Sequence, residues 1–168
     1  IMGNNECIES FTSNLYLRRT LAGEFIVINK YLVKMLIDLG IWNNTIKDKL
    51  MYFKGSVQNI SEIPDYIKKL FKISWEIKQK AVIDLAVGRG PYICQSQSMN
   101  IFMQNPTFNE LTSMHFYGWK NGLKTGSYYI RSKAAITSQN FTISPEIESS
   151  LREELKALEI DDCPTCSA

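Results

Sequence analysis

The sequence has little of several features that would place it in a specialised class of protein. No apolar run approaches the length of a membrane-spanning helix, and the start shows no basic segment followed by an apolar core, so neither an anchor nor a signal peptide is indicated. There is no dense basic run with interleaved aromatic residues, which argues against binding to nucleic acid. These absences favour a soluble protein of the cytoplasm with neither a membrane nor a nucleic acid as partner.

Histidine and cysteine are also scarce. The one histidine, His115, has no second metal-type ligand one helical turn away, so packing or solvent contact is favoured over catalysis or coordination. The four cysteines fit a reducing compartment, where Cys7 and Cys94 are most simply buried thiols. Cys163 and Cys166 have the spacing of a redox pair, although the spacing alone leaves half of a zinc site or an incidental pair equally open.

What the chain contains is typical of one globular domain. Its 168 residues are 45% apolar and 21% charged, which is enough for a hydrophobic core. The net charge of +2 conceals an acidic end, because residues 146–162 hold seven acidic residues against Arg152 and Lys156. We therefore expect the end of the chain to be weakly packed. Ile1 is not an initiator residue, so we expect the chain to be part of a longer polypeptide.

Runs of apolar residues at helical spacing, bounded by capping residues and glycines, predict the first helices. Asn29 and Gly40 bound one run, and Asn43 or Asn44 and Gly55 bound the next. The segment before them, residues 8–25, is less regular. We expect it to form a loop with a short helix.

Two further helices are predicted downstream. Pro64 and Asp65 mark a helix start, because proline is tolerated in the first turn and acids are favourable at the positive end of the helix dipole. A fourth helix is expected over residues 75–87. Gly88-Arg89-Gly90 follows that helix, and this position favours a C-cap over a phosphate loop. The residues expected on the buried sides of these two helices are Tyr66, Ile67, Leu70 and Phe71, and then Trp75, Val82, Leu85 and Ala86.

The remaining elements surround a pair of tyrosines. A strand is expected within residues 97–103, and Thr107 and Glu110 have capping-box spacing at the start of a helix that extends to Gly122. The β-forming run 124–131, which contains Tyr128 and Tyr129, predicts a buried strand. By itself a tyrosine pair in a strand is most often part of a core. Beyond it, a strand at 140–143 and a helix at 148–158 are possible.

Several segments together resemble the end of the large subunit of class I ribonucleotide reductase, in the order of that family. They are Gly3-Asn4-Asn5-Glu6, Thr12-Ser13-Asn14, Ala22-Gly23-Glu24-Phe25, Gly55-Ser56-Val57-Gln58, Glu62-Ile63-Pro64-Asp65, Gln95-Ser96-Gln97-Ser98, Ser113 to Arg131, and Cys163-Pro164-Thr165-Cys166.

The resemblance implies an α/β fold, mostly helical with a few strands, that forms the C-terminal part of a ten-stranded α/β barrel and is incomplete here. Residues 1–143 would belong to the barrel domain, and residues 144–168 would form a flexible acidic tail. The resemblance also implies an enzyme whose large and small subunits together reduce ribonucleoside diphosphates to deoxyribonucleoside diphosphates by radical chemistry for DNA synthesis. The other catalytic residues would lie upstream of Ile1, so the fragment alone is expected to be inactive.

Four residues take functional roles through the resemblance. Tyr128 and Tyr129 match the pair that relays the radical from the small subunit to an active-site cysteine. Neighbours on a regular strand face opposite sides, so contact between these rings requires an irregular strand end. Cys163 and Cys166 match the tail dithiol that reduces the active-site disulfide and is restored by thioredoxin or glutaredoxin.

The resemblance also implies partners and cofactors. The helix over 107–122 resembles the one that helps to form the groove for the C-terminal peptide of the small subunit. The fragment itself is expected to bind no cofactor or metal, whereas the complete enzyme implies a metal and radical cofactor in the small subunit, ATP or dNTP effectors and a homo-oligomer of large subunits. Two alternatives stand beside the enzyme: a non-catalytic truncated module that binds the small subunit, and a redox adaptor that uses only Cys163 and Cys166.

Overall fold

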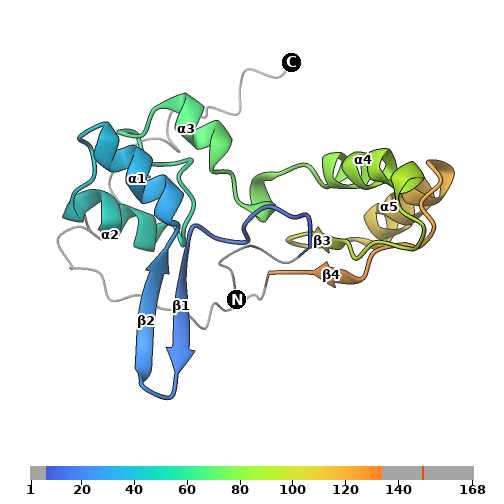
Figure 1. The fold of residues 1–168 in the computed structure, drawn as a ribbon, viewed down its shortest axis with the longest axis horizontal. Coiled ribbons are helices and arrows are strands. Elements are labelled where there is room, and N and C mark those ends of the chain that lie inside the picture. The colour runs from blue at the N-terminus through green and yellow to red at the C-terminus, as the bar shows by residue number, and fades with distance from the viewer. Residues whose placement is uncertain (1–6, 134–148, 150–168) are drawn as a thin grey trace. The chain divides into compact units, whose positions relative to one another are not determined.

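The computed structural model describes residues 7–133 and Ser149. They form two compact units (Figure 1). Residues 14–71 make up the hairpin unit, and residues 7–13 with 72–133 make up the tyrosine unit. The predicted strand at 140–143, the predicted helix at 148–158 apart from Ser149, and the two tail cysteines lie outside the described residues.

The hairpin unit begins with two antiparallel strands and continues with three helices. In chain order these are β1 (Leu15–Thr20), β2 (Gly23–Ile28), α1 (Lys30–Asp38), α2 (Asn44–Tyr52) and α3 (Asp65–Leu70).

The hairpin corrects the prediction of a loop with a short helix over residues 8–25. Its register pairs Leu15 with Ile28 and Thr20 with Gly23, so the backbone of β1 finds its hydrogen-bond partners across the hairpin. The turn is tight, with Gly23 at a φ of +136° and the hydroxyl of Thr20 accepting from Ala22 N at 3.3 Å. Pairing across the turn stabilises a segment whose sequence has no clear helical period.

The predicted caps of α1 and α2 are confirmed. The side chain of Asn29 accepts a hydrogen bond from Tyr31 N at 3.1 Å, and that of Asn43 accepts from Ile46 N at 2.9 Å. Gly40 follows α1 at a φ of +72°, the left-handed conformation that commonly ends a helix. Local sequence therefore determines where these helices begin and where α1 ends.

The core of the hairpin unit brings β1 together with the three helices. Ile67 and Phe71 are buried on one side of α3 as predicted, whereas Tyr66 and Leu70 are exposed. The prediction was wrong for Tyr66 and Leu70 because α3 has only six residues and buries a single row of side chains, that of Ile67 and Phe71. Tyr66 and Leu70 form the adjacent row, which faces outward. The buried core residues are Leu15, Leu32, Leu36, Ile46, Leu50, Met51, Val57, Ile60, Ile63, Ile67 and Phe71.

Asn14 is a buried polar residue that joins three parts of the hairpin unit. Its side chain is 2% exposed, and its amide donates to the carbonyl oxygens of Gly55 at 3.0 Å and Phe71 at 2.8 Å. Its own side-chain oxygen accepts from the amide of Asn29 at 3.0 Å. The side chain of Asn14 thus provides hydrogen-bond partners for a carbonyl oxygen after α2, a carbonyl oxygen at the end of α3 and the side chain of the residue that caps α1.

We expect Asn14→Ala to destabilise the hairpin unit by about 2–4 kcal/mol, because two buried carbonyl oxygens lose their donor and a small cavity forms. The measurement is amide hydrogen exchange of α1 and α2 in the complete protein, where exchange should become faster by more than about tenfold. Thr20→Ala at the exposed hairpin turn is the control and should leave these rates unchanged. Unchanged exchange rates for Asn14→Ala would contradict the role of Asn14 in joining these parts of the hairpin unit.

The tyrosine unit contains two 3₁₀ turns, two helices and a pair of parallel strands. In chain order they are η1 (Ser74–Glu76), α4 (Gln79–Arg89), η2 (Gly90–Tyr92), β3 (Asn100–Phe102), α5 (Phe108–Lys120) and β4 (Tyr129–Arg131). The predicted strand within 97–103 and the predicted helix to Gly122 are confirmed as β3 and α5.

The fourth predicted helix is divided into η1 and α4. Glu76 closes η1 by accepting from Ile73 N at 3.0 Å, and the amide of Gln79 donates to the carbonyl oxygens of Ser74 and Ile77 at 3.1 and 2.8 Å. These side-chain hydrogen bonds pair with backbone groups that would have bonded to one another in a continuous helix. The expected end of the helix is close to the observed one, because Gly90 is the C-cap residue of α4.

The core of the tyrosine unit lies among α4, α5 and β3 (Figure 1). Ala86 is buried as predicted, but Leu85 is exposed and Ile83 is buried, which corrects the predicted inner side of α4. The buried side is shifted because the helix starts at Gln79 instead of Trp75, so the inward row passes through Ile83 and Ala86. The buried cluster consists of Ile83, Ala86, Met99, Ile101 and Met114.

Candidate functional site

Helix α5 leads the chain into the segment that carries the tyrosines. Its capping box is formed as predicted: the hydroxyl of Thr107 accepts from Glu110 N at 3.2 Å, and the carboxylate of Glu110 accepts from Thr107 N at 2.9 Å. The backbone N–H of Thr107, with its hydroxyl, lowers the pKa of Glu110. At the other end Gly122 has a φ of +80°, which allows the chain to turn away from the helix.

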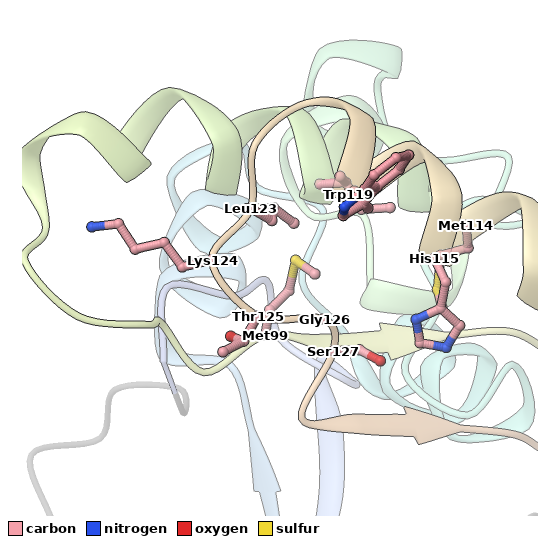
Figure 2. A pocket seen from close by; sticks show the side chains of 11 residues that line it. Met99, Met114, His115, Trp119, Leu123, Lys124, Thr125, Gly126 and Ser127 are labelled. Atoms are coloured by element: carbon pink, nitrogen blue, oxygen red, sulfur yellow. The ribbon is translucent and has the colours of Figure 1, made fainter.

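The segment between α5 and β4 lines a pocket of about 300 Å³. Figure 2 shows His115 projecting from α5 beside Gly126 and Ser127, while Lys124 points away from the other lining side chains. A Cβ atom at Gly126 would lie 3.4 Å from Nδ1 of His115, so the imidazole packs against this segment. The ammonium group of Lys124 donates to the carbonyl oxygen of Ile93. These contacts hold the segment that precedes the tyrosines.

The two tyrosines touch each other. Their ring centroids are 4.3 Å apart at an interplanar angle of 62°. Tyr129 is the first residue of β4 and Tyr128 precedes it, so the pair lies at the strand end. Alternation of side chains does not apply across this boundary, and the irregular strand end that ring contact requires is present.

The pair is exposed, which corrects the prediction of a buried strand. Tyr128 is 66% exposed and Tyr129 52% exposed, and Ile130 is also exposed. Strand β4 pairs in parallel with β3 alone among the described residues, and the core cluster of this unit takes in β3 but no residue of β4. Composition predicted the strand correctly but could not indicate that its side chains would face outward.

The surroundings of Tyr128 favour its neutral phenol. The hydrogen bond between the two side chains, followed by the charge of Tyr129, raises the pKa of Tyr128. The guanidinium carbon of Arg131 lies 5.5 Å from the ring centroid of Tyr129. A cation over a ring disfavours loss of an electron that leaves a positive ring behind. Oxidation of this pair is therefore easiest when the electron and the phenolic proton leave together.

A second exposed aromatic group lies near the end of α5. Phe116 and Trp119, the α5 aromatic pair, are in edge-to-face contact with ring centroids 6.2 Å apart, and Trp119 is 70% exposed. Helix α5 is tied to α4 by Tyr117, whose hydroxyl donates to Asp84 at 2.6 Å. This hydrogen bond raises the pKa of Tyr117. The α5 aromatic pair is thus presented by a fixed helix pair and is available for contact with another chain.

The cysteine predictions have two outcomes. Cys7 and Cys94 are both exposed, so the expectation of buried thiols was wrong. Cysteine is buried most often by residue type, but these two lie in irregular segments outside both cores. Cys163 and Cys166 lie outside the described residues, and their role stays a prediction.

Within residues 7–133 and Ser149, no group of three or more His, Cys, Asp or Glu side chains could hold a metal ion.

Sequence reasoning missed a contact between two residues, Glu9 and Asn100, at the strand that pairs with β4. The carboxylate of Glu9 accepts from Asn100 N at 2.9 Å and from the side-chain amide of Asn100 at 3.2 Å. Asn100 is the residue of β3 that pairs with Tyr129. The partners are 91 residues apart, and no local pattern could have linked them.

Comparison with known proteins identifies the family. The family model described as "Ribonucleotide reductase, barrel domain" matches residues 1–129, which include both tyrosines. This chain belongs to the ribonucleotide reductase family. Among the described residues of this reductase chain, none of the helices is long and apolar enough to cross a membrane.

Curated relatives of this reductase chain extend the match. The ribonucleoside-diphosphate reductase large subunit of Trypanosoma brucei brucei is 57% identical over 146 residues, which cover 87% of the chain and 17% of the relative. The large subunit of Arabidopsis thaliana is 51% identical over 168 residues, which cover 98% and 21%. The chain therefore spans about a fifth of the length of these relatives.

A solved structure supports the fold. The Actinobacillus ureae class Id ribonucleotide reductase alpha subunit is 31% identical with a TM-score of 0.65, over 76% of this chain and 23% of that one. Together with the barrel-domain family, this match confirms the predicted α/β fold as part of a reductase barrel. No closed barrel occurs within residues 7–133, where the strands form two separate two-stranded sheets.

Proposed function

We propose that this chain is the C-terminal portion of the large subunit of a ribonucleoside-diphosphate reductase, which reduces ribonucleoside diphosphates to deoxyribonucleoside diphosphates. The observation that carries the proposal is the contact between Tyr128 and Tyr129, at 4.3 Å, in a chain that belongs to this family. Relatives that carry the name of this enzyme are 51–57% identical to the chain over most of its length. The proposal assigns this portion two tasks, relay of the radical and renewal of the reductant.

The relay uses the tyrosines in sequence. A phenoxyl radical that arrives from the small subunit takes a hydrogen atom, that is one proton and one electron, from the neighbouring phenol. The first phenol is restored and the second becomes the radical. The last transfer takes a hydrogen atom from an active-site cysteine upstream of this chain. Contact between the rings shortens the hop for both the electron and the proton.

Renewal of the reductant uses Cys163 and Cys166. Reduction of each substrate leaves a disulfide in the active site. One tail thiolate attacks that disulfide and the second resolves the mixed disulfide, so the active site regains two thiols and the tail acquires a disulfide. Thioredoxin or glutaredoxin then reduces the tail by the same exchange. The neighbouring segment 146–162 is acidic and polar, a composition that suits a tail able to reach both partners.

The proposed partner at α5 is the C-terminal peptide of the small subunit. The α5 aromatic pair offers exposed apolar area on a helix that Tyr117 ties to α4. The small subunit would hold the metal and radical cofactor, while ATP or dNTP effectors would bind elsewhere in the complete large subunit. A homo-oligomer of large subunits completes the proposed assembly.

Trp119→Ala in the complete large subunit is expected to weaken binding of that peptide by about tenfold or more, because an exposed indole that becomes buried on binding is a frequent hot spot. The measurement is a titration of immobilised subunit with the C-terminal peptide of its small subunit. Tyr92→Ala is the control, since Tyr92 is exposed on η2 of the same unit and is outside the α5 aromatic pair. Equal affinities for both variants would place the peptide elsewhere.

The function itself is tested with the complete gene product that contains this stretch. The purified large subunit is mixed with its small subunit, ATP, a reducing system and each ribonucleoside diphosphate in turn, and the deoxyribonucleotide product is quantified. Formation of deoxyribonucleoside diphosphate supports the proposal. A complete product that binds the small subunit but yields no deoxyribonucleotide would instead establish the non-catalytic binding module.

A further inference from the structure

We propose that Glu9 is a positioning residue for the tyrosine pair and that it acts through Asn100. This inference rests on the proposed radical relay and adds to it a residue that lies outside the relay itself. Glu9 contacts Asn100, the register partner of Tyr129, so its role is to fix the backbone from which the two rings project.

The contact between Glu9 and Asn100 is bidentate. Oε1 of Glu9 accepts from Asn100 N at 2.9 Å and Oε2 accepts from Asn100 Nδ2 at 3.2 Å. Asn100 is only 2% exposed and Glu9 is half-buried, so both bonds are partly shielded from competing water. Hydrogen bonds to a carboxylate are stronger than those between neutral groups. The first residue of β3 is therefore held at two points by one side chain.

The orientation of the Asn100 amide depends on this carboxylate. Its side-chain oxygen is buried and has no hydrogen-bond partner among the described residues. A rotated amide would place that oxygen against the carboxylate of Glu9, where two acceptors repel each other. The donor bond to Glu9 thus sets the conformation of Asn100, and no acceptor bond competes with it in the described part of the chain.

Glu9 is itself held in place by its neighbours. The carbonyl oxygen of Phe11 accepts from Ser74 N at 2.9 Å, and the hydroxyls of Ser10 and Ser74 are 2.9 Å apart. The segment that carries Glu9 is thus attached to the turn before α4. This attachment allows a residue near the start of the described chain to act on a strand 91 positions later.

Strand β3 connects the contact of Glu9 with Asn100 to the backbone of the tyrosines. The carbonyl oxygen of Met99 accepts from Tyr128 N at 2.7 Å, and Asn100 is the register partner of Tyr129. Both tyrosines therefore take their backbone position from Met99, which precedes β3, and from Asn100, the first residue of β3. On the opposite edge, Glu9 satisfies Asn100 N and the side-chain oxygen of Gln79 satisfies Phe102 N at 2.8 Å.

Backbone position matters here because the rings have little else to hold them. Both are more than half exposed, so side-chain packing constrains them weakly. Hydrogen-atom transfer between phenols requires close and correctly oriented oxygens, and a shift of about 1 Å in a reacting group can cost about 100-fold in rate. Loss of the Glu9 contact should therefore slow the relay without affecting the binding of substrate.

The test uses the complete large subunit with its small subunit. Glu9→Ala is expected to lower kcat by about tenfold or more, with the KM for ribonucleoside diphosphate and the affinity for the small subunit unchanged. Glu9→Gln should restore most of kcat, because the amide oxygen can accept from Asn100 N while the Asn100 side chain rotates to accept from the new amide. Glu9→Asp keeps the charge but is one methylene shorter, and is expected to be intermediate.

Glu76→Ala is the matched control, because Glu76 also accepts a hydrogen bond from a backbone N–H in the tyrosine unit, that of Ile73, which precedes η1. The inference is overturned if kcat of Glu9→Ala is unchanged, if Glu76→Ala loses as much, or if only KM rises. If Glu9→Ala does not fold, Glu9→Asp decides: a reduced kcat at constant KM supports the inference and an unchanged kcat overturns it. Tyr128→Phe separates the relay from the positioning role of Glu9. An active Tyr128→Phe enzyme would refute the relay. An inactive Tyr128→Phe enzyme together with a fully active Glu9→Ala enzyme would refute the role of Glu9 alone.

Discussion

Replacing either Tyr128 or Tyr129 with phenylalanine in the complete large subunit is expected to reduce turnover to less than about one-thousandth of that of the unaltered enzyme. Phenylalanine keeps the ring but lacks the phenolic hydrogen. The bond that must break and re-form at each hop is then absent. Both variants should fail equally, because a relay is interrupted by the loss of any member.

The physical setting of the pair makes this substitution unusually informative. Both rings are exposed, so removal of a hydroxyl leaves no buried group unsatisfied and should cost little stability. The ring contact at 4.3 Å can persist in the variants. A loss of turnover can therefore be attributed to the missing phenol and not to a rearranged site.

Three measurements separate loss of the relay from other defects. Nucleotide binding and small-subunit affinity should remain within about twofold of the unaltered protein, as expected for an exposed substitution. Tyr92→Phe, at an exposed tyrosine of the same unit, should be fully active. Retained turnover in either Tyr128→Phe or Tyr129→Phe would refute the relay.

Much of the helical structure could be predicted because its determinants are local. Asn29, Asn43 and the Thr107–Glu110 box each act on backbone groups within three residues, so the sequence alone contains both partners of each bond. Gly40 likewise ends α1 by its own conformation. Helices α1, α2 and α5 were accordingly expected close to where they occur.

The elements that the sequence did not predict depend on distant partners. Strand β1 is formed because Leu15 through Thr20 pair with β2, and its isolated pattern resembles a loop or short helix. The exposure of the tyrosines likewise depends on β4 pairing with β3, and the contact of Glu9 with Asn100 spans 91 residues. Family resemblance located the tyrosines, but only the fold shows what supports them.

Cys166→Ser in the complete large subunit is expected to stop repeated turnover with thioredoxin as reductant while leaving one turnover intact. The active-site thiols are already reduced at the start and can serve the first substrate. The disulfide formed then cannot be returned to thiols, because exchange through the tail needs both an attacking and a resolving thiol. Cys163→Ser should behave in the same way.

The measurement is a rapid-quench time course of deoxyribonucleotide formed per large subunit. We expect an initial burst of about one product per site, as in an enzyme whose renewal step is blocked, followed by a rate reduced by about 100-fold or more. A small dithiol at high concentration should restore continuous turnover, because it can enter the active site without the tail. Its success would show that the radical chemistry of the variant is unimpaired.

Cys94→Ser supplies the matched control, because Cys94 is an exposed cysteine far from the tail in sequence. It should turn over continuously with thioredoxin. Continuous turnover of Cys166→Ser under the same conditions would mean that thioredoxin reduces the active site directly and that the terminal pair is incidental. The tail would then have no part in catalysis, while the tyrosine relay would stand unaffected, because the two proposals rest on separate residues and separate steps of the cycle.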